Sequence, residues 1–377
     1  MWKLLVLLLL PLTVCSAETH PILPLGASAP NFVLPGVDGK IHKLSDYSSS
    51  KILVVVFNCD HCPIAQMYEQ RISQLAADYK NKSVAVVVIQ PNDPKATRID
   101  ELDSSDVGDS LAEMKIRVKY KHLTYPYLYD GATQSVTRAY GPQATPHVFI
   151  FDQQRHLRYE GAMDNSYRIE LVKPKTQYAR NAINELLANK EVTVKHTGVF
   201  GCSTKWQEKE AAQISYLQKL EAEPVPLEMA SADTLKALRA NKTGKMVLID
   251  FWATWCGSCL REFSDLEDTY RMYSDRDFQF VTVSVNMPDE KPSVTRWLNK
   301  MHATSRNLLF DSTDTAALQA AFDPKWESAV PYTILLSGDG KVLYETQGDV
   351  DLLKLRRTIL ANLPSDYIGF NKYWAAE

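Results

Sequence analysis

The feature that most constrains this chain is a Cys-x-x-Cys pair, Cys256 and Cys259, set between an apolar run and an amphipathic stretch. Residues 246–249 have the length and β-branched content of a buried strand, and residues 260–273 carry apolar positions at helical spacing. At such a junction the first thiol faces the positive end of the helix, which favours its thiolate. The second thiol lies about one turn further in, so the pair can close a disulfide. The pattern predicts a redox-active Cys256–Cys259 disulfide. A zinc half-site or a structural disulfide are the alternatives.

The residues around this pair, Phe251-Trp252-Ala253-Thr254-Trp255-Cys256-Gly257-Ser258-Cys259, resemble the active-site stretch of a thioredoxin. The resemblance extends to Asp250, at a position where that family keeps a buried carboxylate. It implies that Cys256 attacks a substrate disulfide and that Asp250 moves protons for Cys259. Where the family often has a lysine on the next strand, this sequence has Ser284.

A second match to the thioredoxin pattern is Val330-Pro331-Tyr332, where that family has a cis-proline facing the active site. The resemblance implies that Trp255, Val330 and Pro331 contact the client protein. Backbone pairing at the Val330-Pro331 edge would make that recognition tolerant of client sequence.

The N-terminal half carries a second pair, Cys59 and Cys62, in a similar context. Residues 25–34 resemble the entry of the redoxin and peroxiredoxin branch of the thioredoxin fold. The apolar run 52–57 predicts a central strand buried on both faces, and a helix is expected from Pro63 onward. We therefore expect a second redox-active disulfide, Cys59–Cys62.

Ala144-Thr145-Pro146 is a second cis-proline signature, which implies that Thr145 and Pro146 contact substrate at the first site. Both halves thus carry the same order of parts. The predicted fold class is α/β, with two thioredoxin-like three-layer domains, each a mixed β-sheet flanked by helices. The predicted division is a signal peptide 1–17, a redoxin-like domain 24–192, a linker 193–224 with Cys202 and a polar helix, a thioredoxin domain 225–364 and a C-terminal tail 365–377.

Residues 1–17 have the pattern of an export signal: a short positive end, a continuous apolar run and small residues at the end. Cys15 invites a lipoprotein interpretation, but Val14 precedes it where a small residue is normal, which favours plain cleavage. Export to the periplasm or the extracellular space permits disulfides. The remaining chain of about 360 residues is too long for one core of the usual size.

Of the six cysteines, Cys202 is the one left over after the signal and the two pairs. The stretch Gly201-Cys202-Ser203-Thr204-Lys205-Trp206 resembles one that follows the redoxin domain in secreted members of this family. That resemblance implies an accessory thiol for the first domain. A small, inert buried cysteine or an intermolecular disulfide are the alternatives.

The first domain also has two alternative interpretations. Peroxiredoxins place a threonine three residues before the attacking cysteine and an arginine on the neighbouring strand. Here that position holds Cys59 when counted back from Cys62 and Val56 when counted back from Cys59, and the arginine position falls at or near Pro146. Disulfide exchange is therefore favoured over peroxide reduction. A Cu(I) site from Cys59, Cys62, His61 and His147 is the other alternative.

Between the predicted strand 84–89 and the helix 111–120 lies an acidic connection. Its carboxylates lack the regular spacing of a calcium loop, so it is predicted to be a solvated insertion. The acidic residues are Asp100, Glu101, Asp103, Asp106 and Asp109.

The sequence therefore predicts an exported thiol–disulfide oxidoreductase with two dithiol sites and no cofactor or metal. Its expected partners are protein thiol and disulfide clients, with a membrane thiol reductase as the candidate electron donor. A formal charge of −3 gives no reason to expect nucleic acid. The alternative without turnover is a client-binding or metal-chaperone module. A charged His61 should make the first site the more oxidising one, while a charged Asp60 should oppose that effect.

Overall fold

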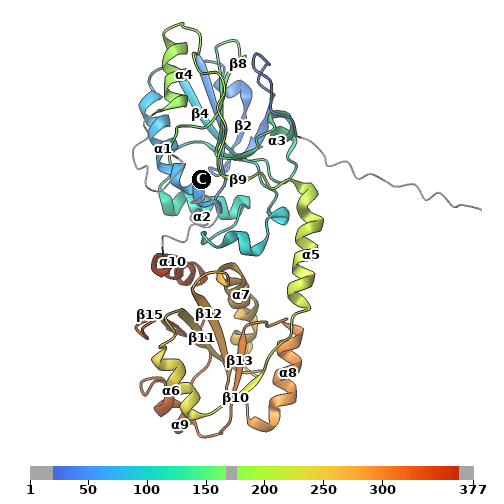
Figure 1. The fold of residues 1–377 in the computed structure, drawn as a ribbon, viewed down its shortest axis with the longest axis vertical. Coiled ribbons are helices and arrows are strands. Elements are labelled where there is room, and N and C mark those ends of the chain that lie inside the picture. Colours follow the sequence, from blue (N-terminus) through green and yellow to red (C-terminus); the bar gives the residue numbers. More distant parts are fainter. Residues whose placement is uncertain (1–19, 167–175, 365–377) are drawn as a thin grey trace, which may run out of the picture.

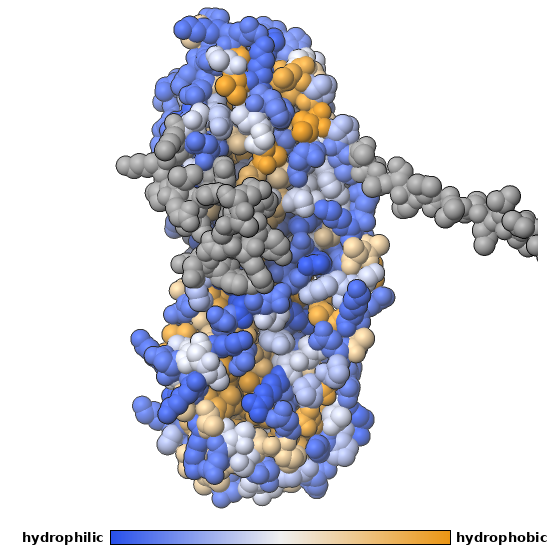
Figure 2. Space-filling model, in the orientation of Figure 1, coloured by the Kyte–Doolittle hydropathy of each residue, from blue (hydrophilic) through white to orange (hydrophobic). Residues whose placement is uncertain are grey.

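The computed structural model describes residues 20–166 and 176–364, so the predicted signal peptide with Cys15 and the tail 365–377 lie outside the described residues. The described part forms two sheet-and-helix units stacked end to end, and α5 (Glu210–Glu221) runs beside them from one to the other (Figure 1). No helix in these ranges is long and apolar enough to span a membrane. Hydrophilic residues cover most of the face shown in Figure 2, with apolar residues scattered among them.

The first unit is built on a five-stranded mixed sheet in the order β5-β4-β3-β7-β8. Strands β3, β4 and β5 are parallel, and β7 and β8 are antiparallel to their neighbours. The strand bounds are β3 Ile52–Phe57, β4 Val84–Gln90, β5 Tyr127–Tyr129, β7 His147–Phe151 and β8 Leu157–Gly161. All six residues of β3 are buried, as the unbroken apolar run predicts.

Helices cover both faces of this sheet. One face packs against α1 (Pro63–Tyr79), α2 (Leu111–Lys121) and α4 (Tyr178–Leu187), and the other against α3 (Ser135–Tyr140) and the N-terminal β1 (Val33–Pro35). β1 pairs with β2 (Ile41–Lys43) outside the main sheet. A further two-stranded ladder joins β6 (Ala144–Thr145) to β9 (Cys202–Ser203).

The second unit repeats this plan with six strands in the order β10-β13-β12-β11-β14-β15. Its elements are β10 Glu228–Ala230, α6 Ala232–Ala240, β11 Met246–Trp252, α7 Gly257–Tyr273, β12 Phe278–Ser284, α8 Lys291–Lys300, β13 Arg306–Phe310, α9 Thr315–Phe322, β14 Tyr332–Leu336, β15 Val342–Gln347 and α10 Leu352–Asn362. Short 3₁₀ turns in the two units are η1 Leu44–Tyr47, η2 Pro94–Ala96, η3 Ile99–Leu102, η4 Gln207–Lys209 and η5 Pro288–Glu290.

Residues of β11 alternate between the two faces of its sheet. Val247, Ile249 and Phe251 pack toward α6 and α9, and the intervening residues pack toward α7, α8 and α10. The predicted fold class, two mixed sheets each flanked by helices, is confirmed.

The acidic connection differs from its prediction, since it is not a solvated insertion. It rests against the second unit: Tyr273 Oη donates to the carbonyl of Ser105 over 2.7 Å, and Arg357 Nε lies 2.7 Å from Asp106 Oδ2. Asp106 and Asp109 are both buried. Spacing in sequence gave no sign of these partners because they lie far along the chain.

Candidate active sites

The second dithiol lies where β11 gives way to α7. Cys256 is the residue that caps α7, and its sulfur accepts the backbone N–H of Cys259 over 3.2 Å. The two cysteines form a disulfide. Cys256 is 6% exposed and Cys259 is 0% exposed, so an incoming thiolate would reach Cys256 first. Trp255, immediately before the pair, is 64% exposed.

The peptide bond between Val330 and Pro331 is cis, as the thioredoxin resemblance implied. The carbonyl oxygen of Val330 lies 3.6 Å from Cys256 Sγ. Pro331 is buried and Val330 is partly exposed. The structure thus brings together Trp255, Cys256 and this edge around one surface.

Asp250 lies on the face of β11 that packs against α7, and it is fully buried. Burial raises its pKa to about 7; a hydrogen bond from Thr333 opposes the rise and the charge of Glu262 adds to it. Thr333 Oγ1 donates to Asp250 Oδ1 over 2.8 Å, and Oδ2 has no hydrogen-bond partner among the described residues. Such a carboxyl can both take up and release a proton near neutral pH. Ser284, at the family's lysine position, bonds Asn286 instead.

Glu262 is a further residue near this site, and it was not predicted from the sequence. Its Oε2 accepts the backbone N–H of Val350 over 3.0 Å, while Oε1 is buried without a partner among the described residues. Burial raises its pKa as well. The sequence spacing could have identified Glu262, because it follows Cys259 by three residues and therefore lies on the same helix face.

The first dithiol is arranged differently. Cys59 and Cys62 are free thiols in this structure rather than the predicted disulfide, and both are 0% exposed. Cys62 caps α1, with Pro63 as the first helical residue. Both sulfurs are directed at the same neighbour, with Cys59 Sγ 3.0 Å from Thr145 Oγ1 and Cys62 Sγ 3.7 Å from the Thr145 carbonyl oxygen.

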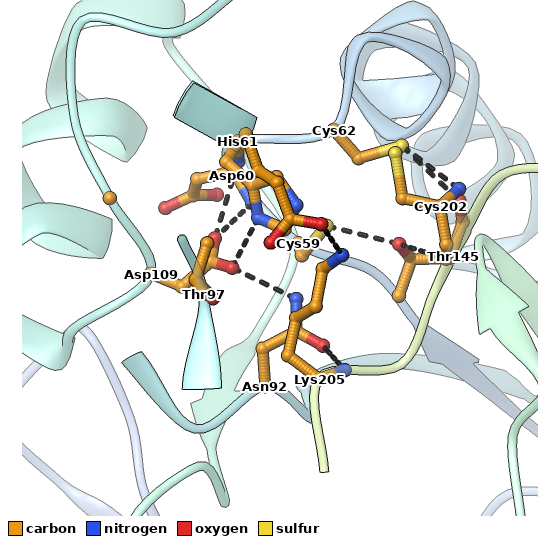
Figure 3. Close-up of polar contacts among 12 residues, drawn as sticks. Cys59, Asp60, His61, Cys62, Asn92, Thr97, Asp109, Thr145, Cys202 and Lys205 are labelled. Carbon is orange, nitrogen blue, oxygen red and sulfur yellow. Dashed lines mark hydrogen bonds and ion pairs between the residues drawn. The ribbon is translucent and has the colours of Figure 1, made fainter. Parts of the chain in front are cut away.

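Cys202 lies at this site, 140 residues beyond Cys62 in the chain. Its backbone N–H donates to Cys62 Sγ over 3.3 Å (Figure 3). β9 pairs with β6, so Thr145 and Cys202 are directly opposite each other. The Thr145–Pro146 bond is cis. The backbone of Thr145, predicted to bind clients, is therefore already paired within the chain.

The thiolate of the first site is Cys62, the second cysteine of the pair. Burial opposes its ionisation, but hydrogen bonds from Cys202 and Cys59 and the charge of His61 together lower its pKa well below the usual range. Burial and the neighbouring Cys62 raise the pKa of Cys59. The hydrogen bond to Cys62 and burial raise the pKa of Cys202.

Asp109, predicted to lie in a solvated insertion, is buried beside His61 and favours its charged form. His61 Nδ1 lies 2.5 Å from Asp109 Oδ2, and Asp109 Oδ1 accepts the backbone N–H groups of Asp60 and His61 (Figure 3). Burial alone would lower the pKa of His61, but Asp109 raises it. Asn92 Nδ2 also donates to Asp109, over 2.8 Å.

Asp60 opposes the Cys62 thiolate less than predicted. Burial and the charge of Asp109 raise its pKa well above the usual range, which favours its neutral form. Its Oδ1 accepts the hydroxyl of Tyr127 over 3.0 Å.

The Cu(I) ligand set considered from the sequence is not assembled. His147 Nε2 lies 2.9 Å from Glu160 Oε2, and its Nδ1 accepts the backbone N–H of Gln143. Cys59, His61 and Asp109 do offer ligand atoms within 4.8 Å of one another. The ion pair uses Nδ1 of His61 and Oδ2 of Asp109, while Nε2 of His61 is buried without a hydrogen-bond partner among the described residues.

Residues 25–160 match the family model described as AhpC/TSA family, and residues 215–357 match the one described as Redoxin. The chain carries two redoxin-type domains of the thioredoxin fold. Among curated relatives, it is 30% identical over 105 residues to "Thiol-disulfide oxidoreductase ResA" of Bacillus subtilis, covering 28% of this chain and 54% of that one. It is 25% identical over 116 residues to "Thiol:disulfide interchange protein DsbE" of Vibrio cholerae, covering 31% and 57%. The chain thus spans about half the length of these relatives.

Two solved structures are also similar. A hypothetical protein from Sinorhizobium meliloti is 32% identical with a TM-score of 0.44, covering 50% of this chain and 97% of that one. An uncharacterized conserved protein from Geobacillus kaustophilus is 35% identical with a TM-score of 0.44, covering 49% and 93%.

Proposed function

We propose that this protein is a thiol–disulfide oxidoreductase that exchanges disulfides with protein clients through Cys256 and Cys259. The observation that carries the proposal is the disulfide at the start of α7. Cys256 is the more exposed of its two cysteines, at 6%, and a buried carboxyl of pKa about 7 lies on the adjoining strand. A dithiol that is reached at one sulfur and protected at the other is what a two-step exchange requires.

In the reducing direction, the Cys256 thiolate attacks one sulfur of a client disulfide. A mixed disulfide forms and the other client sulfur leaves as a thiolate. Cys259 then loses its proton to Asp250 and attacks Cys256 Sγ, which releases the second client thiol and closes the Cys256–Cys259 bond. The pKa of Asp250 near 7 suits this transfer in both directions.

The client would contact the surface around Cys256. Trp255 is exposed there, and so is Met287 in the neighbouring loop. Two hydrogen bonds hold those loops together: Thr254 N–H to Asn286 Oδ1 over 2.9 Å and Asn286 Nδ2 to Thr254 Oγ1 over 2.7 Å. Two exposed apolar side chains on tethered loops, next to the Val330–Pro331 edge, suit an unfolded or extended polypeptide.

We also propose that the protein acts after export, in the periplasm or outside the cell, with residues 1–17 as the signal. A membrane thiol reductase is the proposed electron donor, since an oxidised Cys256–Cys259 pair must be reduced before each reductive turnover. The proposed domain limits remain 24–192 and 225–364.

Insulin reduction by the full-length protein, with dithiothreitol as the electron donor, tests the function. Cys256→Ser should lower the rate at least ~100-fold, because it removes the attacking sulfur. Cys202→Ser is the matched control, since it makes the same substitution at a cysteine of the other site, and it should retain the parent rate. No turnover by the parent protein would leave a client-binding module as the function.

A further inference from the structure

Part of the predicted linker occupies the edge of the first site at which an extended client would pair. Ala144 lies opposite Ser203 and Thr145 opposite Cys202 in an antiparallel ladder. Gly201 comes so close that a Cβ atom there would lie 1.9 Å from the carbonyl oxygen of Thr145, and its φ is +151°. Only glycine permits this approach. The chain therefore lies on the Thr145 edge as a bound strand would.

The residues after Cys202 anchor this strand. Thr204 Oγ1 donates to the carbonyl of Pro142 over 2.8 Å, and the backbone N–H of Lys205 donates to Asn92 Oδ1 over 2.8 Å. Lys205 Nζ lies 2.5 Å from Glu101 Oε1. Thr204 and Lys205 thus hold the strand in place, and Figure 3 shows the contact between Lys205 and Asn92.

The anchored strand carries a thiol to a dithiol that solvent does not reach. Cys59 and Cys62 are fully buried, whereas Cys202 is partly exposed. Among the cysteines of the first unit within residues 20–166 and 176–364, Cys202 is thus the thiol that an outside molecule can meet. Its own backbone N–H already contacts the sulfur of Cys62.

We propose that residues 200–204 are a built-in client of the first dithiol, and that outside thiols and disulfides exchange with Cys59 and Cys62 only through Cys202. The proposal goes beyond the proposed function, which concerns Cys256 and Cys259, by assigning thiol–disulfide exchange to the first dithiol as well. Under this proposal, residues 200–204 of the same chain, rather than an external client protein, occupy the edge formed by Thr145 and Pro146. The outside reactant is then a small disulfide or thiol that fits at a partly exposed sulfur.

Oxidation by a small disulfide RSSR proceeds in three exchanges. Cys202 attacks one sulfur, forming Cys202–S–R and releasing RSH. The Cys62 thiolate attacks Cys202 Sγ, so a Cys62–Cys202 bond forms and the second RSH leaves. Cys59 then attacks Cys62 Sγ, forming Cys59–Cys62 and returning Cys202 to its thiol. One RSSR gains two electrons and two protons, and two thiols of the domain lose them.

The reverse direction suits the same geometry. An incoming thiolate attacks the outer sulfur of a Cys62–Cys202 disulfide, and Cys62 leaves. The thiol with the lowest pKa is the best leaving group, and Cys62 is the thiol of this cluster whose pKa is lowered. The exposed sulfur is therefore the one attacked and the buried sulfur the one released.

The test uses the full-length chain with Cys256→Ser and Cys259→Ser, so that the second site is silent. The reduced protein is treated with glutathione disulfide, quenched with an alkylating agent and digested for disulfide mapping by mass spectrometry. With Cys59→Ser added, the Cys62–Cys202 disulfide should accumulate. With Cys202→Ser added instead, Cys59–Cys62 should form at least ~10-fold more slowly, because buried thiols exchange slowly. Ser203→Ala, on the same short strand, should leave that rate unchanged.

Formation of Cys59–Cys62 at the parent rate in the Cys202→Ser protein would overturn the proposal, and so would a Cys202 disulfide between two chains. Gly201→Ala provides an independent variant, since the added methyl must displace the strand. Alkylation of Cys62 should then rise at least ~10-fold under native conditions, as exposure of a low-pKa thiol requires. Unchanged protection of Cys62 in a folded Gly201→Ala protein would also overturn it. Insulin reduction through Cys256 is measured separately and does not depend on either outcome.

Discussion

The two dithiol sites have the same Cys-x-x-Cys spacing, yet their helices begin at different cysteines. Cys256, the first of its pair, caps α7, whereas Cys62, the second of its pair, caps α1. Pro63 explains the offset, because proline is favoured as the first residue of a helix. The helix end therefore favours a different thiolate in each site: the outer Cys256 in one and the buried Cys62 in the other. Equal spacing does not mean equal chemistry.

The residues around the two dithiols also differ. The second site has an outer cysteine that is 6% exposed, an exposed tryptophan beside it and a buried carboxyl for proton transfer. The first site has a buried ion pair, His61 with Asp109, and a strand of its own chain across the client edge. At the position matching Asp250, opposite the residue two after the cis-proline on the paired strand, it has Val56, which is part of the core. We interpret the second site as open to proteins and the first as closed to them.

The largest effect that sharpens this comparison should come from Asp250→Asn. Losing the proton acceptor should slow resolution of the mixed disulfide by roughly 100-fold, the usual scale for general acid–base catalysis. Stopped-flow measurement of the resolution step across pH 5 to 9 checks it. A rate equal to that of the parent at every pH would remove Asp250 from the mechanism.

The Asp250→Asn variant should lose less stability than the parent protein as the pH rises. The pKa of Asp250 rises from an ordinary 3.8 to about 7 on folding, so the folded protein keeps a proton that the unfolded chain releases. Parent stability should therefore fall as pH increases from about 4 to about 7, by at most roughly 4 kcal/mol at about 1.4 kcal/mol per pKa unit. Asparagine does not titrate, so denaturant unfolding of Asp250→Asn should show a smaller fall over that range.

The next largest effect should be a difference in reduction potential between the two sites. A charged His61 stabilises the Cys62 thiolate, and with it the reduced state, while the raised pKa of Asp60 weakens the opposing effect of that carboxyl. The first site should be the more oxidising by more than about 30 mV, which corresponds to about 1.4 kcal/mol. Glutathione redox titration of full-length proteins, with the cysteines of the other site changed to serine, checks this. A first-site potential at or below that of the second would reverse the expected electron flow.

The smallest effect concerns the hydroxyl that bonds Asp250. Thr333→Val removes a hydrogen bond to the carboxylate, so the pKa of Asp250 should rise by about half a unit to one unit. The midpoint of the resolution rate against pH should move upward by that amount. Thr282→Val is the matched control: Thr282 lies opposite Asp250 on β12, but its hydroxyl bonds Asn307. An equal change in both variants would mean that the hydrogen bond to Asp250 is not the cause.

Sequence patterns predicted what depends on neighbours in the chain. The buried run of β3, the helix after Pro63 and the capping position of Cys256 all follow from spacing over a few residues. The Asp109 partner of His61 lies 48 residues away, so no local pattern marks it. The raised pKa of Asp60 depends on burial, which a polar residue in a loop does not reveal. The close approach of Gly201 likewise appears only when the chain returns to the Thr145 edge.

The central claim is that the second site is open to client proteins and the first is closed to them. The most direct test compares how well Cys256 and Cys62 capture a protein disulfide covalently. Two full-length proteins are prepared. The first retains Cys256 and carries Cys259→Ser, with Cys59 and Cys62 also changed to serine. The second retains Cys62 and carries Cys59→Ser, with Cys256 and Cys259 also changed to serine. Each is mixed with oxidised insulin and the intact masses are measured. The account predicts a covalent insulin adduct on Cys256 in the first protein, and in the second no insulin adduct, with Cys62 and Cys202 remaining thiols. Equal capture of insulin by Cys62 would contradict it.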